Sequence, residues 1–236
     1  MNDKSLVVAK INFRNIKLAY VFTAILFFGV IIEDIVFILL DYFGAYSGNE
    51  GNTTVGIGNY LFLLVIFSAI LIPSRNFRRM MNLGGKRSNF FTGSALGYVI
   101  LTAAVSLAGI LLYFTYERYV TLSYYGGGSL NVLDVFGWMS NGPVVAFFQQ
   151  FAFLLLFASV LHTLVAAQEK WYGWAADVLI VAIISVFTPI ASLRKVLVSF
   201  FHLIIFSPAV LQIASCLVIA AAVYMLNKPI FTRRAI

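Results

Sequence analysis

Charge is scarce in this sequence. Of its 236 residues, 11% are Asp, Glu, Lys or Arg and 61% are hydrophobic, and the mean hydropathy is +0.95. A soluble domain carries about 25% charged residues, because polar groups must cover its surface in water. The composition therefore excludes a soluble globular protein, and the short segments between the apolar runs leave no room for an independent catalytic domain.

Residue types suited to catalysis or metal binding are also few. The single cysteine, Cys216, has no partner for an intramolecular disulfide, and the two histidines, His162 and His202, lie far apart. There is no H-E-x-x-H zinc motif and no G-x-S-x-G nucleophile elbow. The segment 83–88, LGGKRS, lacks the upstream glycine and the Ser or Thr of a phosphate-binding loop. We therefore expect no catalytic residue, no metal and no cofactor on this chain.

Long apolar runs dominate what is present. A transmembrane helix needs about 20 apolar residues. We predict a single all-α integral membrane domain over 1–236 whose six transmembrane helices cover residues 18–40, 53–73, 91–114, 143–167, 173–189 and 207–226. The run 191–206 is apolar but contains Arg194 and Lys195 near its start. We expect it to form a re-entrant segment at the outer face before the last span.

The net charge of +7 is unevenly distributed along the chain. Of the sixteen Lys and Arg residues, four precede the first span, five lie in 74–89, one lies in 168–172 and three lie in the tail. Only three, Arg118, Arg194 and Lys195, fall in the segments expected on the outer side. Cytoplasmic loops of membrane proteins carry such an excess of cations. This asymmetry predicts a multi-pass protein of the cell membrane with both termini in the cytoplasm, and it accounts for the positive charge without a nucleic-acid partner.

The N-terminal segment 1–17 places Lys10, Arg14 and Lys17 on one helical stripe, with apolar residues on both sides. This pattern favours an interfacial elbow helix that leads into the first span. A frayed basic tail is the alternative.

Acidic residues occur within and just after the first apolar run, at Glu33, Asp34 and Asp41. A carboxylate near the bilayer centre costs about 2.5–3.5 kcal/mol on insertion scales, so it should face protein or water. One interpretation is a substrate or cation contact in a translocation path. The other is a structural pair with another helix, or a position close to the outer interface. Asp34 and Asp41 are two turns apart on one face, and such an acidic strip would attract a cationic, amphipathic peptide.

The cytoplasmic segment 74–91 combines five cations with Phe77, Met80, Met81 and Leu83. A loop that met only water would not need these apolar residues. We expect a short helix over 77–90 that docks onto a soluble partner. The alternative is a basic loop that touches anionic lipid.

These features resemble the permease subunits of type-two ABC exporters. In several bacterial members the coupling segment reads roughly L-G-x-x-R-x-x-F-F, and residues 83–91, LGGKRSNFF, match it at five positions. The chain departs from it at Lys86, where a small hydroxyl residue is common. Within the family the chain looks most like the small Gram-positive permeases that export peptides, such as the phenol-soluble modulin exporters. The candidate ATPase-coupling residues are then Phe77, Arg78, Arg79, Leu83, Gly84, Arg87 and Phe90.

The resemblance implies a bacterial permease that pairs with a second permease, identical or related, and with a separate ABC ATPase that binds ATP and Mg. Its substrate would be an amphipathic peptide or a lipid-like molecule, and membrane lipid would surround it. An ion-coupled secondary transporter or channel that uses Glu33 or Asp34 is the alternative, although the sequence shows no inverted repeat. An intramembrane enzyme is disfavoured by the missing catalytic motifs.

Overall fold

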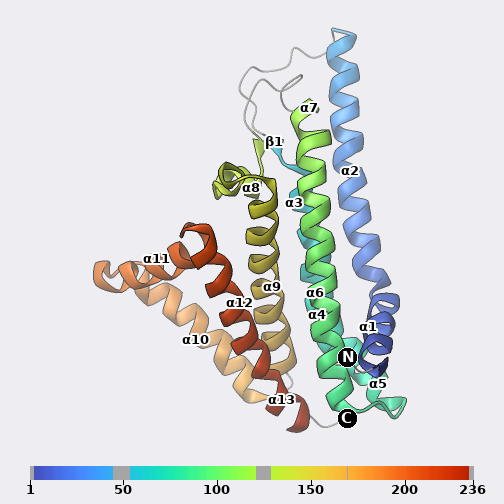
Figure 1. Cartoon of the computed structure of the whole chain (residues 1–236), viewed down its shortest axis with the longest axis vertical. Helices are drawn as coiled ribbons and strands as arrows, with labels where there is room; N and C mark the ends of the chain where they lie inside the picture. Colours follow the sequence, from blue (N-terminus) through green and yellow to red (C-terminus); the bar gives the residue numbers. More distant parts are fainter. Residues whose placement is uncertain (1–2, 45–53, 121–128, 169, 234–236) are drawn as a thin grey trace.

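The protein is built almost entirely of helices (Figure 1). The computed structural model describes residues 3–44, 54–120, 129–168 and 170–233. Within these residues, 5 helices are long and apolar enough to cross a membrane: Lys17–Tyr42, Ile57–Asn82, Arg87–Val120, Pro143–Ala167 and Ala209–Phe231. A sixth crossing is formed if Trp171–Phe187 and Ala191–Ile205, which are bent by 118° at their junction, count as one broken span. This is the architecture of an all-α, multi-pass membrane protein.

The first half of the chain forms three long helical segments. Helix α1 (Asp3–Asn15) precedes α2 (Lys17–Tyr42). The second segment joins α3 (Ile57–Tyr60), α4 (Phe62–Leu71), the π-helical turn η1 (Ile72–Asn76) and α5 (Phe77–Asn82). Pro73 lies in η1, where a widened turn accommodates its missing N–H. The third segment joins α6 (Arg87–Leu112), a second π-helical turn η2 (Tyr113–Glu117) and α7 (Arg118–Val120).

The second half begins with short elements. Strand β2 (Ser129–Leu130) pairs in parallel with β1 (Thr54–Val55), and α8 (Val132–Val135) and the 3₁₀ turn η4 (Trp138–Asn141) follow. The remaining helices are α9 (Pro143–Ala167), α10 (Trp171–Phe187), α11 (Ala191–Ile205), α12 (Ala209–Met225) and α13 (Asn227–Arg233). Helix α9 has the bounds expected for the span 143–167, whereas the second and third segments run further than the apolar runs 53–73 and 91–114.

Helices α6 and α9 form the centre of the bundle, and α1, α4 and α12 pack against them. The largest buried cluster draws its side chains from α1, α4, α6, α9, α12 and α13. In contrast, α10 and α11 project from the bundle as a bent pair, and α2 lies along its opposite side (Figure 1). Only 6% of the most apolar stretch of α2 is buried, so most of its surface is free for lipid or another helix.

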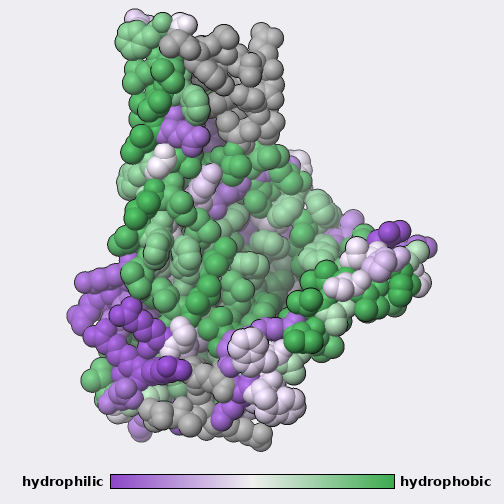
Figure 2. Space-filling view, turned by 180° about the vertical axis from the view of Figure 1, so that it is seen from behind, coloured by the Kyte–Doolittle hydropathy of each residue, from purple (hydrophilic) through white to green (hydrophobic). Residues whose placement is uncertain are grey.

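The two ends of the bundle differ in polarity. The N-terminus, α5, α13 and the start of α10 lie together at one end, called the basic end here, and β1, α7 and α8 lie at the other, the far end (Figure 1). Figure 2 shows hydrophilic residues gathered at the basic end on the side of α1 and α5, and hydrophobic residues along the bundle. Such a belt of apolar surface is what a bilayer would cover.

Candidate functional site

The turn between α5 and α6 is an exposed part of the basic end. Helix α5 ends at Asn82 with Leu83 as its C-cap, and the next residue, Gly84, has a φ of +79°, in the left-handed region that glycine adopts without strain. The N–H of Gly84 donates to the carbonyl of Met81 at 2.9 Å, and the N–H of Gly85 donates to that of Met80 at 3.0 Å. This pair of bonds is the Schellman motif that closes a helix C-terminus. The turn leaves Leu83 80% exposed at its tip.

An aromatic cluster supports this turn from inside. Phe77 and Phe90, which flank the turn in sequence, are both fully buried, and their ring centroids are 5.2 Å apart. Phe231 of α13 packs on both, at 4.8 Å from Phe77 and 5.4 Å from Phe90. The cluster continues to His162 on α9, 5.6 Å from Phe231. The turn is therefore connected through packed rings to α13 and to the central helix α9.

Helix α1 braces the other side of the turn. Its closest approach to α6 is at Gly93, where an added Cβ would lie 2.5 Å from the Cβ of Val8, so only glycine allows this packing. Asn12 on α1 donates to Ser94 at 3.1 Å and accepts from the amide of Asn76 at 3.3 Å. These bonds satisfy buried polar groups and fix α1 against η1 and α6.

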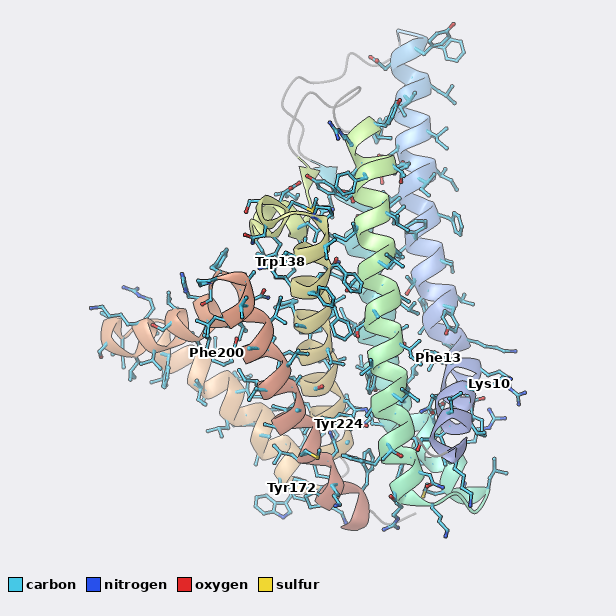
Figure 3. The ribbon with its side chains drawn as sticks, viewed as in Figure 1. Lys10, Phe13, Trp138, Tyr172, Phe200 and Tyr224 are labelled. Carbon is cyan, nitrogen blue, oxygen red and sulfur yellow. The ribbon has the colours of Figure 1, made fainter. Side chains whose placement is uncertain are left out.

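A further bond joins α1 to the turn itself. The guanidinium of Arg79 donates to the side-chain oxygen of Asn15 at 3.2 Å. Lys10 points away from the bundle (Figure 3), and the neighbouring Leu6, Val7 and Ile11 are exposed apolar residues. The segment 1–17 thus contains the expected helix, and its stripe of cations lies beside apolar residues that suit a membrane interface.

The structure corrects the expectation of one short helix over 77–90. Residues Phe77–Asn82 continue the second long segment and Arg87 begins the third, so only a tight turn lies between them. The physical reason is the glycine pair at 84 and 85, which ends one helix and lets the chain reverse. Among the candidate coupling residues, Arg78, Arg79, Leu83 and Gly84 are exposed and Arg87 is half-buried. Phe77 and Phe90 lie in the core, where they support the turn and cannot meet a partner directly.

The three acidic residues near the first span do not form one site. Glu33 and Asp41 are exposed on α2, whereas Asp34 is half-buried and accepts a hydrogen bond from the hydroxyl of Tyr116 at 2.7 Å. Tyr116 lies in η2, one turn before the end of the third segment at Val120. Glu33 and Asp34 therefore lie in the half of α2 that is nearer the far end of the bundle.

A buried carboxylate that sequence reasoning missed lies nearby. Glu117 is 5% exposed, and its oxygens accept from the backbone N–H of Gly58 at 2.9 Å and from the amide of Asn131 at 2.5 Å. A Cβ on Gly56 would lie 2.9 Å from both carboxylate oxygens. Glu117 therefore joins the segments that carry β1 and β2. Its position just after an apolar run made it look like a loop residue, and only the glycines at 56 and 58 hinted at a close contact.

The two histidines also lie in different surroundings. His162 is fully buried, and its Nδ1 is 2.7 Å from the hydroxyl of Tyr98 on α6. Tyr224 of α12, which points toward α6 (Figure 3), donates to the carbonyl of Phe91 at 2.8 Å and packs beside the His162 ring at 5.3 Å. His202 is exposed on α11. Among the described residues, no group of three His, Cys, Asp or Glu side chains could hold a metal ion.

Comparisons of the chain with protein-family models, with curated proteins and with solved structures found no match. The arrangement of the basic end is therefore interpreted on its own geometry.

Proposed function

We propose that the chain is the membrane-spanning permease subunit of an ATP-driven ABC exporter. The observation that carries the proposal is the turn between α5 and α6. It presents Leu83 and the cations Arg78 and Arg79 at the surface, and it rests on a buried aromatic cluster that reaches the central helices. A projecting apolar residue among cations on a rigid support suits docking onto a soluble partner that must push or pull the bundle.

The proposed topology has six crossings, with both termini and the basic end in the cytoplasm of a bacterial cell. Helices α10 and α11 together serve as the fifth crossing, and α11 is the re-entrant part that returns at the outer face. The excess of Lys and Arg at the end that holds α1, α5 and α13 supports this orientation.

Two apolar surfaces support pairing with a second permease, identical or related. Most side chains of α2 are exposed, and so are most side chains of α10 and α11. Lipid can cover such helices, but Glu33 on the exposed side of α2 is costly in contact with lipid. A second subunit would give this carboxylate a protein or aqueous environment in the assembled transporter.

In this proposal the chain hydrolyses no ATP. A separate ABC ATPase binds ATP and Mg and contacts the turn at Leu83. When the ATPase moves the turn, the contacts of Phe77 and Phe90 with Phe231 pass the displacement to α13 and α9. The proposed substrate is an amphipathic peptide or a similar hydrophobic molecule, because Glu33, Asp34 and Asp41 make the half of α2 toward the far end acidic, and this half would attract a cationic group.

The test is a charge reversal at the turn. In the triple variant Arg78→Glu, Arg79→Glu and Arg87→Glu, we expect the chain to insert normally but to lose both stoichiometric co-purification with the ATPase and transport. The matched control reverses the three cations outside the basic segments, Arg118, Arg194 and Lys195, and should keep the ATPase bound. Normal transport by the first triple variant would contradict the docking role of the turn.

A further inference from the structure

A pocket of about 320 Å³ lies at the far end of the bundle. One wall is formed by the segment before α9, including Phe136, Trp138 and Asn141, and the opposite wall by the turn between α11 and α12, including Phe206 and Ser207. The indole N–H of Trp138 donates to the carbonyl of Ile205 at 2.9 Å and holds the two walls together. Figure 3 shows Trp138 between the upper ends of α9 and α12. Pockets that hold small molecules enclose about 300–1,000 Å³, so this one is large enough for a ligand group.

The polar groups of the pocket have unused hydrogen-bonding capacity. Gln149 is 1% exposed, and its Oε1 accepts from the amide of Asn141 at 3.2 Å, but its Nε2 has no acceptor among the described residues. The hydroxyl of Ser140 donates to the carbonyl of Gly137 at 2.6 Å, and that of Ser207 donates to the carbonyl of His202 at 3.2 Å. Both hydroxyl oxygens can still accept a bond. The pocket thus offers one buried donor and several acceptors.

None of the lining residues among the described part of the chain is charged. A phosphate or a free carboxylate placed here would lose its hydration without gaining a cation, which is strongly unfavourable. A quaternary ammonium group needs the open faces of aromatic rings. Here the rings of Phe136 and Trp138 pack edge to face at 5.1 Å and Trp138 is buried, so among the described lining residues Phe206, which is 53% exposed, is the one ring with an open face, and a single open face does not make an aromatic cage. A hydroxyl group both donates and accepts, and therefore matches the groups present.

Exposed apolar residues lie at the rim of the pocket, which favours a ligand whose polar group is attached to a hydrocarbon chain. Phe206, the C-cap of α11, lines the pocket and is 53% exposed, and Val210, near the start of α12, is 82% exposed. Val210 follows the lining residue Ala209, so in a membrane an acyl chain could lie against the side chains of Phe206 and Val210 while the polar head occupies the pocket.

We propose that this pocket binds the uncharged polyhydroxyl headgroup of a lipid, with the acyl chains along Phe206 and Val210. The buried amide of Gln149 and the side chain of Asn141 bond the hydroxyl groups. The inference needs the protein to lie in a membrane, but it does not depend on export or on an ATPase.

The experiment uses the full chain in nanodiscs of phosphatidylcholine that contain a minor fraction of glucosyl diacylglycerol as the probe. Native mass spectrometry measures which lipid stays bound. The parent protein should retain the glycolipid about tenfold over its share of the bilayer, the factor that one or two net hydrogen bonds provide. Gln149→Leu and Asn141→Leu should each abolish the enrichment. Asn141 is exposed, so its variant should fold even if the buried Gln149→Leu does not.

Gln150→Leu is the matched control, because Gln150 is an equally buried amide on α9 that faces Gly109 of α6 and not the pocket. It should keep the enrichment. Equal retention by the parent and both pocket variants, or a preference for phosphatidylcholine, would overturn the proposal. If methyl glucoside in the buffer stabilises the protein against heat as strongly as the glycolipid does, the ligand is a free sugar and the lipid assignment is wrong.

Discussion

The ring of Phe77 stacks on the ring of Phe231, with centroids 4.8 Å apart and planes at 28°. The first residue stands just before the exposed turn at Leu83, and the second belongs to the last helix, α13. Because Phe90 closes the same cluster from the other side of the turn, α13 is packed directly behind the surface proposed to meet the ATPase.

Replacing Phe231 tests this link. Phe231→Ala removes a fully buried ring, a change that costs about 3–5 kcal/mol in soluble proteins, and we expect a clear fall in the melting temperature of the purified protein. Phe43→Ala is the control, since Phe43 is 76% exposed at the end of α2. The melting temperature of Phe231→Leu, which keeps much of the side-chain volume, should lie between those of Phe231→Ala and Phe43→Ala. An unchanged melting temperature for Phe231→Ala would show that α13 does not brace the turn.

The same cluster shows what the sequence alone could and could not provide. Phe77 and Phe90 stand next to five cations, which predicted a segment outside the apolar spans, and the structure places the α5–α6 turn at one end of the bundle. Their burial depends on Phe231, which is separated from them by most of the chain, and no local pattern predicts a contact of that range. The glycines at 84 and 85 did carry a signal, because two consecutive glycines after an apolar turn favour a helix C-cap over a continuous helix.

Gly84 should be sensitive to substitution for a conformational reason. Its φ of +79° is unfavourable for any residue with a Cβ, and Gly84→Ala should cost about 1 kcal/mol even though no atom crowds the site. Gly29→Ala is the opposite case, since Gly29 lies within α2 with nothing near its Cβ position, and alanine is the better helix former. In chemical denaturation in detergent, the free energy of unfolding should be higher for Gly29→Ala than for the parent and lower for Gly84→Ala. The reverse order would contradict the C-cap assigned to Gly84.

Two glycines of α6 make a second matched pair. An added Cβ at Gly93 would meet the Cβ of Val8 at 2.5 Å, whereas the position at Gly97 is open. Gly93→Ala should therefore push α1 away from α6, with an overpacking cost of about 1–3 kcal/mol, and Gly97→Ala should be neutral or stabilising. Thiol labelling of Val8→Cys, a buried position, reports the separation. Equal labelling in both glycine backgrounds would mean that α1 is not held against α6.

The buried carboxylate of Glu117 predicts a strong effect of a conservative change. Glu117→Gln would place an N–H₂ group against either the N–H of Gly58 or the amide of Asn131, and two donors cannot bond each other. The loss of one charge-assisted bond and the unpaired donor should cost about 2–3 kcal/mol. Glu33→Gln, at an exposed position, should have little effect on thermal stability. A stable Glu117→Gln protein would indicate that the contact between the β1 and β2 segments is held by other groups.

The helical pair α10 and α11 shows where sequence reasoning worked. The cations Arg194 and Lys195 near the start of the apolar run predicted a separate element over 191–206, and α11 is a separate helix bent by 118° from α10. Glu117 shows where it failed, since its partner Gly58 is 59 residues away and no local pattern indicated the contact. For Asp34 the sequence left a structural pair with another helix open, and the bond from Tyr116 is such a pair, although the sequence could not name the partner. The apolar spans of a membrane protein can be recognised from local sequence, but the contacts between its helices cannot.

Asp34 and Tyr116 provide the final test, because the substrate argument depends on what Asp34 does. If the 2.7 Å bond is purely structural, Tyr116→Phe should lower thermal stability at least as much as Asp34→Asn, because the side-chain oxygen of asparagine can still accept from the tyrosine hydroxyl, and the double variant should be no worse than Tyr116→Phe. Export of a cationic peptide would then fall no further in Asp34→Asn than in Tyr116→Phe. If the carboxylate also attracts the substrate, Asp34→Asn should reduce export more than Tyr116→Phe at matched protein levels. Raising the salt concentration should then make the difference in export between the two variants smaller.

Adding Glu33→Gln to Asp34→Asn should reduce export further, because Glu33 is exposed beside Asp34. Export by the Asp34→Asn, Glu33→Gln protein at the parent rate would leave the acidic residues with a structural role and remove the main support for a cationic substrate.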